Sequence, residues 1–414
     1  MATKKRVSER ESNNTSFAVR MKKYILSKIN SLLRFVDPAV PKKSHYWILP
    51  VYFIGKGNFS DNMLAIFETI KDDPKIKKII LTKEKNIKVE GKNTVIIPMG
   101  SWRAVWFLLR AKVVFVQHSI WLDLLRAKFQ IHHPRGREVI QLWHGVPIKD
   151  LSHKNTGIIN ERSKLEMKNY KVITSSSTDK KNMKKAFWGV KEENFWITGI
   201  PRNDFLIMEE EELPGTYKEE LRGLRTLIGN KKLIVYAPTY RETNADGRYY
   251  EFTEEELNKL EDYLIRNDAI LGVRYHIFRK PDYYKKIIQR KNIVDLSAEV
   301  ISDIRLVIRE SHLVITDYSS LYVDATYINK KCISFAYDFK HYLETQRGFF
   351  YDFETIFPGE ICLNFNSLLE ALERIDEEAT EASFGEIKRI QNTLFENMDR
   401  DNSQRVVDRV KSIL

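Results

Sequence analysis

Short runs rich in β-branched and aromatic residues alternate with amphipathic helical patterns along most of this chain, and this alternation restricts the fold more than any other feature. A strand, a helix and a second strand in succession form a parallel βαβ unit, because parallel strands need a long crossover connection. A charged, helix-prone connector at Glu209–Asn230 separates two such blocks. The sequence therefore predicts an α/β protein with two doubly wound, Rossmann-like domains.

The predicted strands of the first block are Tyr46–Ile54, Lys78–Thr82, Thr94–Pro98, Val113–Gln117, Val139–Trp143, Lys171–Thr174 and Phe195–Thr198. Those of the second block are Lys232–Tyr236, Ala269–Tyr275, Asn292–Asp295, Leu313–Thr316 and Cys332–Phe335. We therefore expect a basic segment at 1–44, a first domain at 45–208, the connector at 209–230, a second domain at 231–382 and helices at 383–414 that pack back across the first domain.

The chain carries 68 Lys and Arg residues against 56 Asp and Glu residues, a net charge of +12. Residues 1–43 contain eleven basic and three acidic residues, so eight of the twelve excess charges lie in this segment. Apolar residues recur in it at helical spacing, namely Phe17, Met21, Ile25, Ile29, Leu32, Leu33 and Val36. Such a basic amphipathic helix either lies on an anionic membrane surface or packs on the protein's own core.

Other partners and compartments are less compatible with the sequence. Nucleic-acid binding is not expected, because the charge is confined to one end and no zinc-finger, RRM or helix-turn-helix signature is present. The two cysteines, Cys332 and Cys362, fit neither a disulfide framework nor a metal site. No segment has the length of a membrane span or the apolar core of a secretory signal, so we expect the chain to stay inside the cell.

Ligands of open α/β sheets bind beyond the carboxyl ends of the strands. Directly after the strand Leu313–Thr316 come Ser319 and Ser320, which open a helix and offer hydroxyl donors to an anion, although a simple helix cap has the same pattern. Asp324 lies one turn into this helix, where it either holds a ribose or polyol hydroxyl or complements the helix dipole.

Two further strand ends of the second block carry groups suited to anions. Arg274 and His276 close one strand and project to the same side, as expected for a pyrophosphate site, although a structural Arg–carboxylate pair is equally compatible. Thr239 and Arg241 occupy the equivalent position after the neighbouring strand. Three strand ends with anion-type donors favour one phosphate-binding crevice.

In the first block, His144 follows a strand and is followed by Gly145, which permits close backbone approach, so His144 is a candidate general base. A lone histidine is more often structural than catalytic. After the first strand, Asp61 and Asn62 follow a glycine-containing turn, and we expect them to cap a helix on the acceptor side of the crevice. His132 and His133 lack metal-ligand spacing.

With these residues assembled, the chain from Tyr46 to its C-terminus resembles the CDP-glycerol glycerophosphotransferase family, the teichoic-acid primases and polymerases of bacterial cell walls. The segments that carry the resemblance, in order, are Ser60-Asp61-Asn62, Leu142-Trp143-His144-Gly145, Gly199-Ile200-Pro201-Arg202-Asn203-Asp204, Tyr236-Ala237-Pro238-Thr239-Tyr240-Arg241, Arg274-Tyr275-His276, Ile315-Thr316-Asp317-Tyr318-Ser319-Ser320 with Asp324, Arg347-Gly348, Tyr351-Asp352 and Pro358-Gly359. Where the family usually has Arg-x-His-Pro, this chain has Ile277 after His276.

The resemblance implies a GT-B architecture in which the second domain holds a CDP-polyol. It implies that His144 and His276 are the catalytic histidines, with His144 as the base, and that Arg347 joins the donor-binding residues. The expected activity is transfer of a polyol phosphate, most simply glycerol phosphate, from the CDP-polyol to a hydroxyl of a lipid-linked acceptor, with release of CMP. No cofactor is obligatory in this interpretation, although Mg²⁺ is compatible with it.

Three alternatives remain open at this point: a CDP-ribitol donor, a GT-B glycosyltransferase that uses a nucleotide sugar, and a basic binding protein without enzymatic activity. A lipid-linked acceptor would explain the basic helix. The enzyme would then work as a peripheral protein at the cytoplasmic face of the bacterial cell membrane, and the helix would bind the anionic surface.

Overall fold

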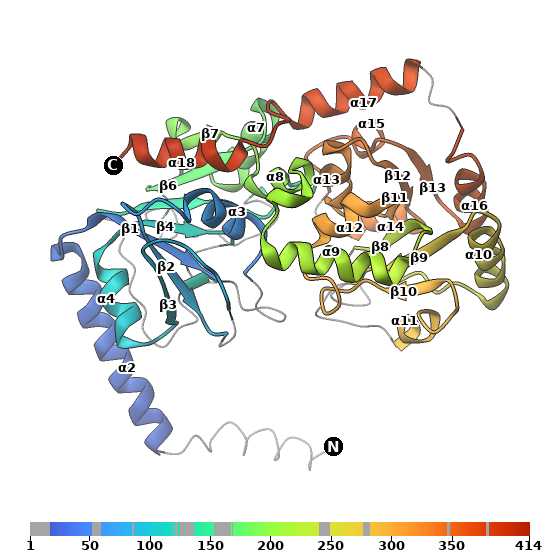
Figure 1. Cartoon of the computed structure of the whole chain (residues 1–414). Coiled ribbons are helices and arrows are strands. Elements are labelled where there is room, and N and C mark those ends of the chain that lie inside the picture. The colour runs from blue at the N-terminus through green and yellow to red at the C-terminus, as the bar shows by residue number, and fades with distance from the viewer. Residues whose placement is uncertain are drawn as a thin grey trace, which may run out of the picture.

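The computed structural model describes residues 17–51, 59–84, 87–118, 120, 123–124, 136–152, 167, 169–239, 249–275, 282–345, 348–377 and 381–414. In this part of the chain, two parallel β-sheets flanked by helices form two domains (Figure 1). The predicted α/β class with two Rossmann-like domains in a GT-B arrangement is confirmed.

The first sheet has the strand order β3-β2-β1-β4-β5-β6-β7, and all neighbouring strands within it are parallel. Its strands are β1 (Lys43–Pro50), β2 (Lys77–Thr82), β3 (Thr94–Pro98), β4 (Ala111–Val116), β5 (Glu138–Gln141), β6 (Tyr170–Thr174) and β7 (Phe195–Ile197). The order reverses between β1 and β4, which opens a crevice at the carboxyl ends of these strands.

The second sheet has the order β10-β9-β8-β11-β12-β13 and is also parallel. Its strands are β8 (Lys232–Ala237), β9 (Ala269–Val273), β10 (Ile293–Asp295), β11 (Ser311–Thr316), β12 (Lys331–Phe335) and β13 (Glu360–Cys362). The order reverses between β8 and β11. The sequence analysis does not predict the edge strand β13, whose three residues contain a single β-branched one, Ile361.

Helices cover the faces of the sheets. Those that precede the connector are α2 (Phe17–Val36), α3 (Asp61–Ile70), α4 (Trp102–Arg110), α7 (Ser177–Ala186) and α8 (Asp204–Ile207). Those that follow are α9 (Gly215–Ile228), α10 (Glu254–Arg266), α11 (Asp282–Ile287), α12 (Ile304–Glu310), α13 (Leu321–Tyr327), α14 (Phe339–Thr345), α15 (Phe353–Ile356), α16 (Phe365–Glu373), α17 (Glu381–Leu394) and α18 (Asn402–Ser412). Short 3₁₀ helices are η1 (Asp37–Ala39), η3 (Glu192–Asn194), η4 (Pro201–Asn203) and η5 (Glu210–Glu212).

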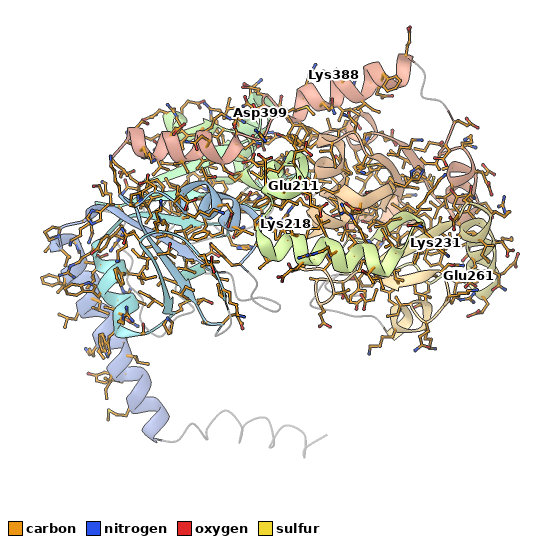
Figure 2. All side chains as sticks on the ribbon, in the orientation of Figure 1. Glu211, Lys218, Lys231, Glu261, Lys388 and Asp399 are labelled. Atoms are coloured by element: carbon orange, nitrogen blue, oxygen red, sulfur yellow. The ribbon has the colours of Figure 1, made fainter. Side chains whose placement is uncertain are left out.

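One hydrophobic core extends from the first domain into the second. It contains Leu49 of β1, Phe67 of α3, Leu221 of α9, Val235 of β8 and Val323 of α13, all buried. Side chains alternate along each strand, so Ile48 and Ile234, one residue earlier, belong to the separate cores on the outer faces of their sheets. The shared core joins the two inner faces, and exposed charged side chains such as Glu211, Lys388 and Asp399 stand outside (Figure 2).

The connector forms helix α9, whose apolar residues face this shared core. Tyr217, Leu221, Leu224 and Ile228 are buried at spacings of three and four residues. Full burial of such side chains contributes about 1.5–3 kcal/mol each. The connector is therefore part of the junction between the domains.

The helix α2 packs with only part of its apolar surface. Leu26, Ile29 and Leu33 lie against the outer core of the first sheet. Met21, Ile25, Leu32 and Val36 are exposed, as are Tyr24 and Phe35, and Phe35 is 83% exposed. The apolar pattern expected to form one stripe is thus divided between a packed face and a solvent-facing one. Of the helices within the described ranges, none has the length and hydrophobicity required to cross a bilayer.

The two last helices contact both domains. Helix α17 contacts α13 and α7, and α18 contacts α3 and η4 (Figure 1). Asp204 accepts hydrogen bonds from the backbone N–H groups of Asn402 (3.0 Å) and Ser403 (2.8 Å) at the start of α18, and from the side-chain amide of Asn402 (2.8 Å). Gly199 lies directly beneath Asn402 with φ +78°, and a Cβ at this position would overlap Asn402 Oδ1.

Because of this overlap, we expect Gly199→Ala to lower the free energy of unfolding by about 2–4 kcal/mol, from backbone strain and overpacking combined. In the double variant Gly199→Ala/Asn402→Ala, the new methyl group occupies the space of the missing amide. Thermal unfolding should then show a total destabilisation smaller than the sum of the two single effects. Simple additivity would contradict the packing described.

Candidate functional site

A cleft of about 480 Å³ lies between the two domains. Its wall on the first domain is formed by residues 143–149 and Leu151, which follow β5. Its wall on the second domain is formed by residues 237–239 after β8, 274–275 after β9 and 319–321 after β11, together with Ile304. The cleft therefore lies at the carboxyl ends of strands in both sheets, as the sequence predicts.

His144 projects into this cleft from a tight turn. The two residues beside it, Trp143 and Gly145, have φ values of +51° and +117°. The His144 ring stacks between Trp143 and His118, with ring centroids 4.2 Å and 5.1 Å away. Its Nδ1 atom lies 3.4 Å from the Gln117 carbonyl oxygen. With Nδ1–H directed to that carbonyl, Nε2 is the nitrogen left to accept a proton.

The His144 imidazole is neutral at physiological pH. Desolvation in the cleft and the neighbouring His118 both oppose protonation of this imidazole, so the pKa of His144 falls to about 4. His118 in turn contacts Asp123 through its Nδ1 atom, 3.2 Å from Oδ1. A neutral histidine open to the cleft can act as a general base.

Hydroxyl groups line the opposite wall. The Thr239 side chain is almost completely buried, and its Oγ1 atom has no hydrogen-bond partner. Ser319 Oγ accepts a hydrogen bond from Leu321 N (3.3 Å), whereas the Ser320 hydroxyl makes no capping bond. Asp317 ties the two loops together by accepting from the Thr239 backbone N–H (2.8 Å). The predicted residues Thr239, Ser319 and Ser320 are thus brought together.

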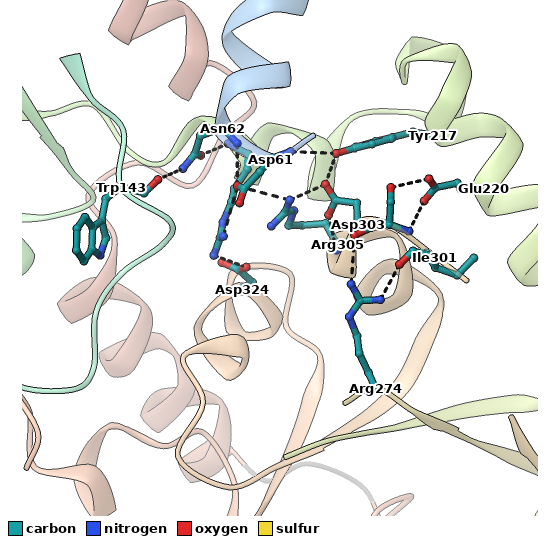
Figure 3. A network of polar contacts seen from close by, with 12 residues as sticks. Asp61, Asn62, Trp143, Tyr217, Glu220, Arg274, Ile301, Asp303, Arg305 and Asp324 are labelled. Atoms are coloured by element: carbon teal, nitrogen blue, oxygen red, sulfur yellow. Dashed lines mark hydrogen bonds and ion pairs between the residues drawn. The ribbon is translucent and has the colours of Figure 1, made fainter. Parts of the chain in front are cut away.

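Arg274 lines the cleft, but its donors point elsewhere. Nη1 donates to the carbonyl oxygens of Leu296 and Ile301 (both 2.8 Å), and Nη2 donates to Ser302 O (3.2 Å). Figure 3 shows the Arg274 guanidinium beside Ile301. Burial lowers the pKa of Arg274 to about 10. The side chain expected at a pyrophosphate thus directs its Nη1 and Nη2 atoms to backbone carbonyls of its own domain.

Asp324, Asp61 and Asn62 bond to groups of the protein. Asp324 lies in the first turn of α13, is buried and accepts from Arg202 Nη2 (2.8 Å). Asn62 is fully buried and donates to the carbonyls of Leu142 (3.2 Å) and Trp143 (2.9 Å). None of the three is among the residues that line the cleft.

Asp61 belongs to a network of buried charges at the domain junction (Figure 3). Its Oδ1 atom lies 3.4 Å from Arg202 Nη1 and 3.5 Å from Arg305 Nη2. Arg305 also pairs with Asp303 at 2.5 Å, and Asp303 accepts a hydrogen bond from Tyr217. Burial alone would raise the pKa of Asp61, but the two guanidinium groups lower it to about 2.

A second contact between the domains borders the cleft. Lys149 forms an antiparallel bridge with Phe349, and Phe350 N donates to Ile148 O (2.8 Å). Asp150 N donates to Gly348 O (2.9 Å). The segment that follows Arg347 is therefore attached to the wall that carries His144.

Three predicted site residues, Arg241, His276 and Arg347, lie outside the described residues. His132 and His133 lie outside them as well. Both cysteines are free and buried away from the cleft lining. Within the ranges that the structure describes, no group of three or more His, Cys, Asp or Glu side chains has an arrangement suited to a metal ion.

The sequence interpretation missed the roles of His118, Lys149 and Arg202. His118 follows β4 at the reversal of strand order, and the rule that selected His144 applies to it equally. Arg202 is part of a segment that carries the family resemblance, but it follows no long strand, so nothing local indicates that it reaches the cleft wall.

The protein-family model described as CDP-Glycerol:Poly(glycerophosphate) glycerophosphotransferase matches residues 40–412. The teichoic acid ribitol-phosphate polymerase TarL of Staphylococcus aureus is 30% identical over 290 residues, which cover 68% of this chain and 49% of that protein. The teichoic acid poly(glycerol phosphate) polymerase of Bacillus spizizenii is 27% identical over 385 residues, covering 86% of this chain and 91% of that protein.

The chain spans about half the length of TarL and of the related TarK, 49% and 53%. Among solved structures, the wall teichoic acid polymerase TagF superposes with a TM-score of 0.73 at 21% identity, covering 100% of this chain and 98% of that one. This likeness shows that the two chains share a fold.

Proposed function

Because the chain belongs to the CDP-glycerol:poly(glycerophosphate) glycerophosphotransferase family, we propose that it transfers a polyol phosphate from a CDP-polyol to an acceptor hydroxyl and releases CMP. The observation that carries this proposal is the composition of one cleft. A neutral imidazole, His144, lines it from the first domain, and the hydroxyl groups of Thr239, Ser319 and Ser320 line it from the second.

The second domain is the proposed donor side. Threonine and serine hydroxyls donate hydrogen bonds to phosphate oxygens, and the buried, unpartnered Thr239 hydroxyl gains a partner when a phosphate binds. Arg241, His276 and Arg347 remain proposed donor-binding residues on the basis of their neighbours. Tyr275, next to His276, lines the cleft, and Gly348, next to Arg347, bonds to its wall.

In the proposed reaction, the acceptor hydroxyl loses its proton to His144 Nε2 while its oxygen attacks the phosphorus that carries the polyol. The new P–O bond forms as the P–O bond to CMP breaks, and CMP leaves with the bonding electron pair. The product is a phosphodiester. Such a reaction depends on positioning and on stabilisation of negative charge more than on covalent participation by the protein.

Glycerol phosphate is our first choice of transferred group. The alignment with the Bacillus spizizenii poly(glycerol phosphate) polymerase covers nearly the whole length of both chains. Ribitol phosphate is the second candidate, because TarL and TarK are the relatives with 30% identity. The relatives' names point to a teichoic-acid chain as acceptor, and we propose a lipid-linked one.

We also propose that the enzyme binds the cytoplasmic face of the membrane through α2 and α4. Leu32 and Phe35 of α2 and Trp102 and Trp106 of α4 are each more than half exposed. Both helices pack on the same outer core of the first sheet. Arg110 stacks its guanidinium on Trp106, 3.3 Å from the ring centroid. Exposed aromatic residues beside basic ones are typical of membrane-surface helices.

The first test of the function measures nucleotide release. With a lipid-linked acceptor, we expect CMP from CDP-glycerol or CDP-ribitol and no UDP from UDP-sugars, measured by chromatography. Release of UDP alone would contradict the proposal.

The second test replaces the proposed base. His144→Ala should lower kcat by about 10²–10⁴-fold, while the Kd for the donor stays unchanged.

The matched control for this experiment is His45→Ala, an exposed histidine at the start of β1. It should retain full activity. Because His144 is already neutral above a pKa of about 4, the acidic limb of kcat/KM should lie well below pH 6.5. Full turnover by His144→Ala at saturating acceptor would remove its role as base.

Thr239→Val tests the donor side, since valine keeps the shape of threonine but has no hydroxyl. Loss of a hydrogen bond to a charged phosphate costs about 1.5–3 kcal/mol, so the Kd for the CDP-polyol should rise by about 10–100-fold in calorimetry. The thermal stability of the free protein should be unchanged or higher, because a buried unpaired hydroxyl is removed. The exposed Thr226→Val on α9 is the control; equal Kd values for both variants would exclude Thr239 from the donor site.

The membrane proposal predicts that Leu32→Ser/Phe35→Ser reduces co-sedimentation with anionic vesicles by about tenfold or more, and that salt weakens binding of the wild type. Phe384→Ser, which alters an exposed phenylalanine on α17, is the control and should bind like the wild type. Equal vesicle binding by all three proteins would show that the α2 surface does not contact lipid.

A further inference from the structure

The turn that carries His144 has a strained backbone that side chains from outside the turn stabilise. Trp143, with φ +51°, has left-handed backbone geometry that a bulky L-residue rarely adopts. Its carbonyl accepts from Asn62 Nδ2 (2.9 Å), and its N–H donates to Gln141 Oε1 (2.9 Å). Side chains outside the turn therefore keep it in place.

Arg202 is attached to the same turn in two ways. Its backbone N–H donates to Asn62 Oδ1 (2.9 Å), so one amide connects the turn to η4. Its guanidinium lies against Gly145, where a Cβ would overlap Nη2. The Arg202 side chain is 9% exposed, so it fills the space directly behind the residue that follows His144.

The other end of this contact lies on the second domain. Arg202 Nη2 donates to Asp324 Oδ2 (2.8 Å), and Nη1 lies 3.4 Å from Asp61 Oδ1. Asp324 belongs to α13, the helix that begins directly after Ser320. One guanidinium thus connects the turn of His144 with the helix that follows the proposed donor-binding serines.

We propose that Arg202 is a positioning residue, which fixes the distance between His144 and the hydroxyl groups of the second domain by holding Gly145 on one side and Asp324 on the other. This inference rests on the proposed function and names a residue that its reaction requires. Arg202 does not touch the reacting groups and is not itself a catalytic residue.

The charges around Arg202 explain why an arginine is needed. A guanidinium is planar and donates in two directions, so it spans Asp61 and Asp324 while lying flat against a glycine. A lysine ammonium is a single point charge and cannot do both. Arg202 and Arg305 together face the buried carboxylates of Asp303 and Asp324 and the partly buried one of Asp61, so loss of Arg202 leaves three carboxylates with one guanidinium.

This arrangement also acts on His144 electrically. The charged or titratable groups that face His144 are His118 after β4, Arg202 on η4 and Asp61 at the start of α3. Lys149 and Arg274 line the same cleft. Arg202 disfavours protonation of the imidazole, whereas Asp61 favours it. Removal of the Arg202 cation therefore shifts the pKa of His144 upward.

The test compares Arg202→Met and Arg202→Lys with Arg309→Met. Arg309 of α12 also joins the domain junction, where its Nη1 donates to Phe205 O (2.7 Å) and Met208 O (2.6 Å), but neither of these residues lines the cleft. We expect Arg202→Met to lower kcat by about 10²-fold or more with the KM for the donor within threefold of the wild type. Arg202→Lys should regain less than a tenth of the kcat that Arg202→Met loses. Arg309→Met should keep kcat within threefold of the wild type.

A second readout needs no substrate. Nuclear magnetic resonance of ¹⁵N-histidine-labelled protein, with His144→Gln to assign the signal, should show a higher pKa of His144 in Arg202→Met and an unchanged one in Arg309→Met. Absence of CMP release by the wild type would refute the proposed function, whereas this titration would still report the contact.

Two results overturn the proposal. One is a loss of kcat in Arg202→Met no greater than in Arg309→Met. The other is a pKa of His144 that is the same in Arg202→Met as in the wild type, which would leave Arg202 with a structural role only. If Arg202→Met does not fold, Asp324→Asn replaces it, because this change weakens only the far anchor; kcat within threefold of the wild type would then overturn the proposal.

Discussion

The structure depends on the pairing of buried charges where its two domains meet. Asp61 and Arg202 come from the first domain, and Asp303, Arg305 and Asp324 come from the second. Removal of one partner from a buried ion pair typically costs about 3–5 kcal/mol, because the remaining charge stays buried without compensation. The pairs that cross between the domains, Arg202–Asp324 and Arg305–Asp61, form only in the observed orientation, and both sheets share one hydrophobic core. The charges therefore specify the orientation that the apolar contacts stabilise.

The same principle separates two uses of polar residues at strand ends. Thr239, Ser319 and Ser320 line the cleft, and at least one of their hydroxyls lacks a protein partner. Arg274 and Asp324 also follow or adjoin strand ends, yet they bind backbone carbonyls and a guanidinium. A charged group loses more hydration energy than a hydroxyl when it is buried, so it needs its partners within the protein. In the cleft, Thr239 Oγ1 therefore stays without a protein partner, whereas the Nη1 and Nη2 atoms of Arg274 have theirs.

The sequence predicts the sheets and the position of the cleft better than it predicts the partners of single side chains. The alternation of strands and helices predicts both sheets, and the rule for strand ends predicts where the cleft lies, because both follow from local period and topology. The partner of a given side chain does not follow in this way. Asn62 looks like a helix cap in the sequence, but it bonds to carbonyls about eighty residues away. The apolar residues of α2 form one helical pattern, and only the fold shows that Ile29 is packed while Leu32 is exposed.

Arg274 keeps a positive charge beside the cleft although its Nη1 and Nη2 atoms bond to backbone carbonyls. Burial lowers its pKa, but only to about 10, so the guanidinium is positively charged at neutral pH. Its Nη1 atom is solvated by two neutral carbonyls, which orient the side chain without cancelling its charge. In a cleft of low dielectric constant, such a charge attracts an anion over several ångströms without contact. In the reaction that we propose, Arg274 therefore contributes a fixed field to the donor side, and the hydroxyl groups supply the directional bonds. Fixed charges of this kind need no reorganisation when negative charge develops on a leaving group, and a phosphoryl-transfer site requires this property.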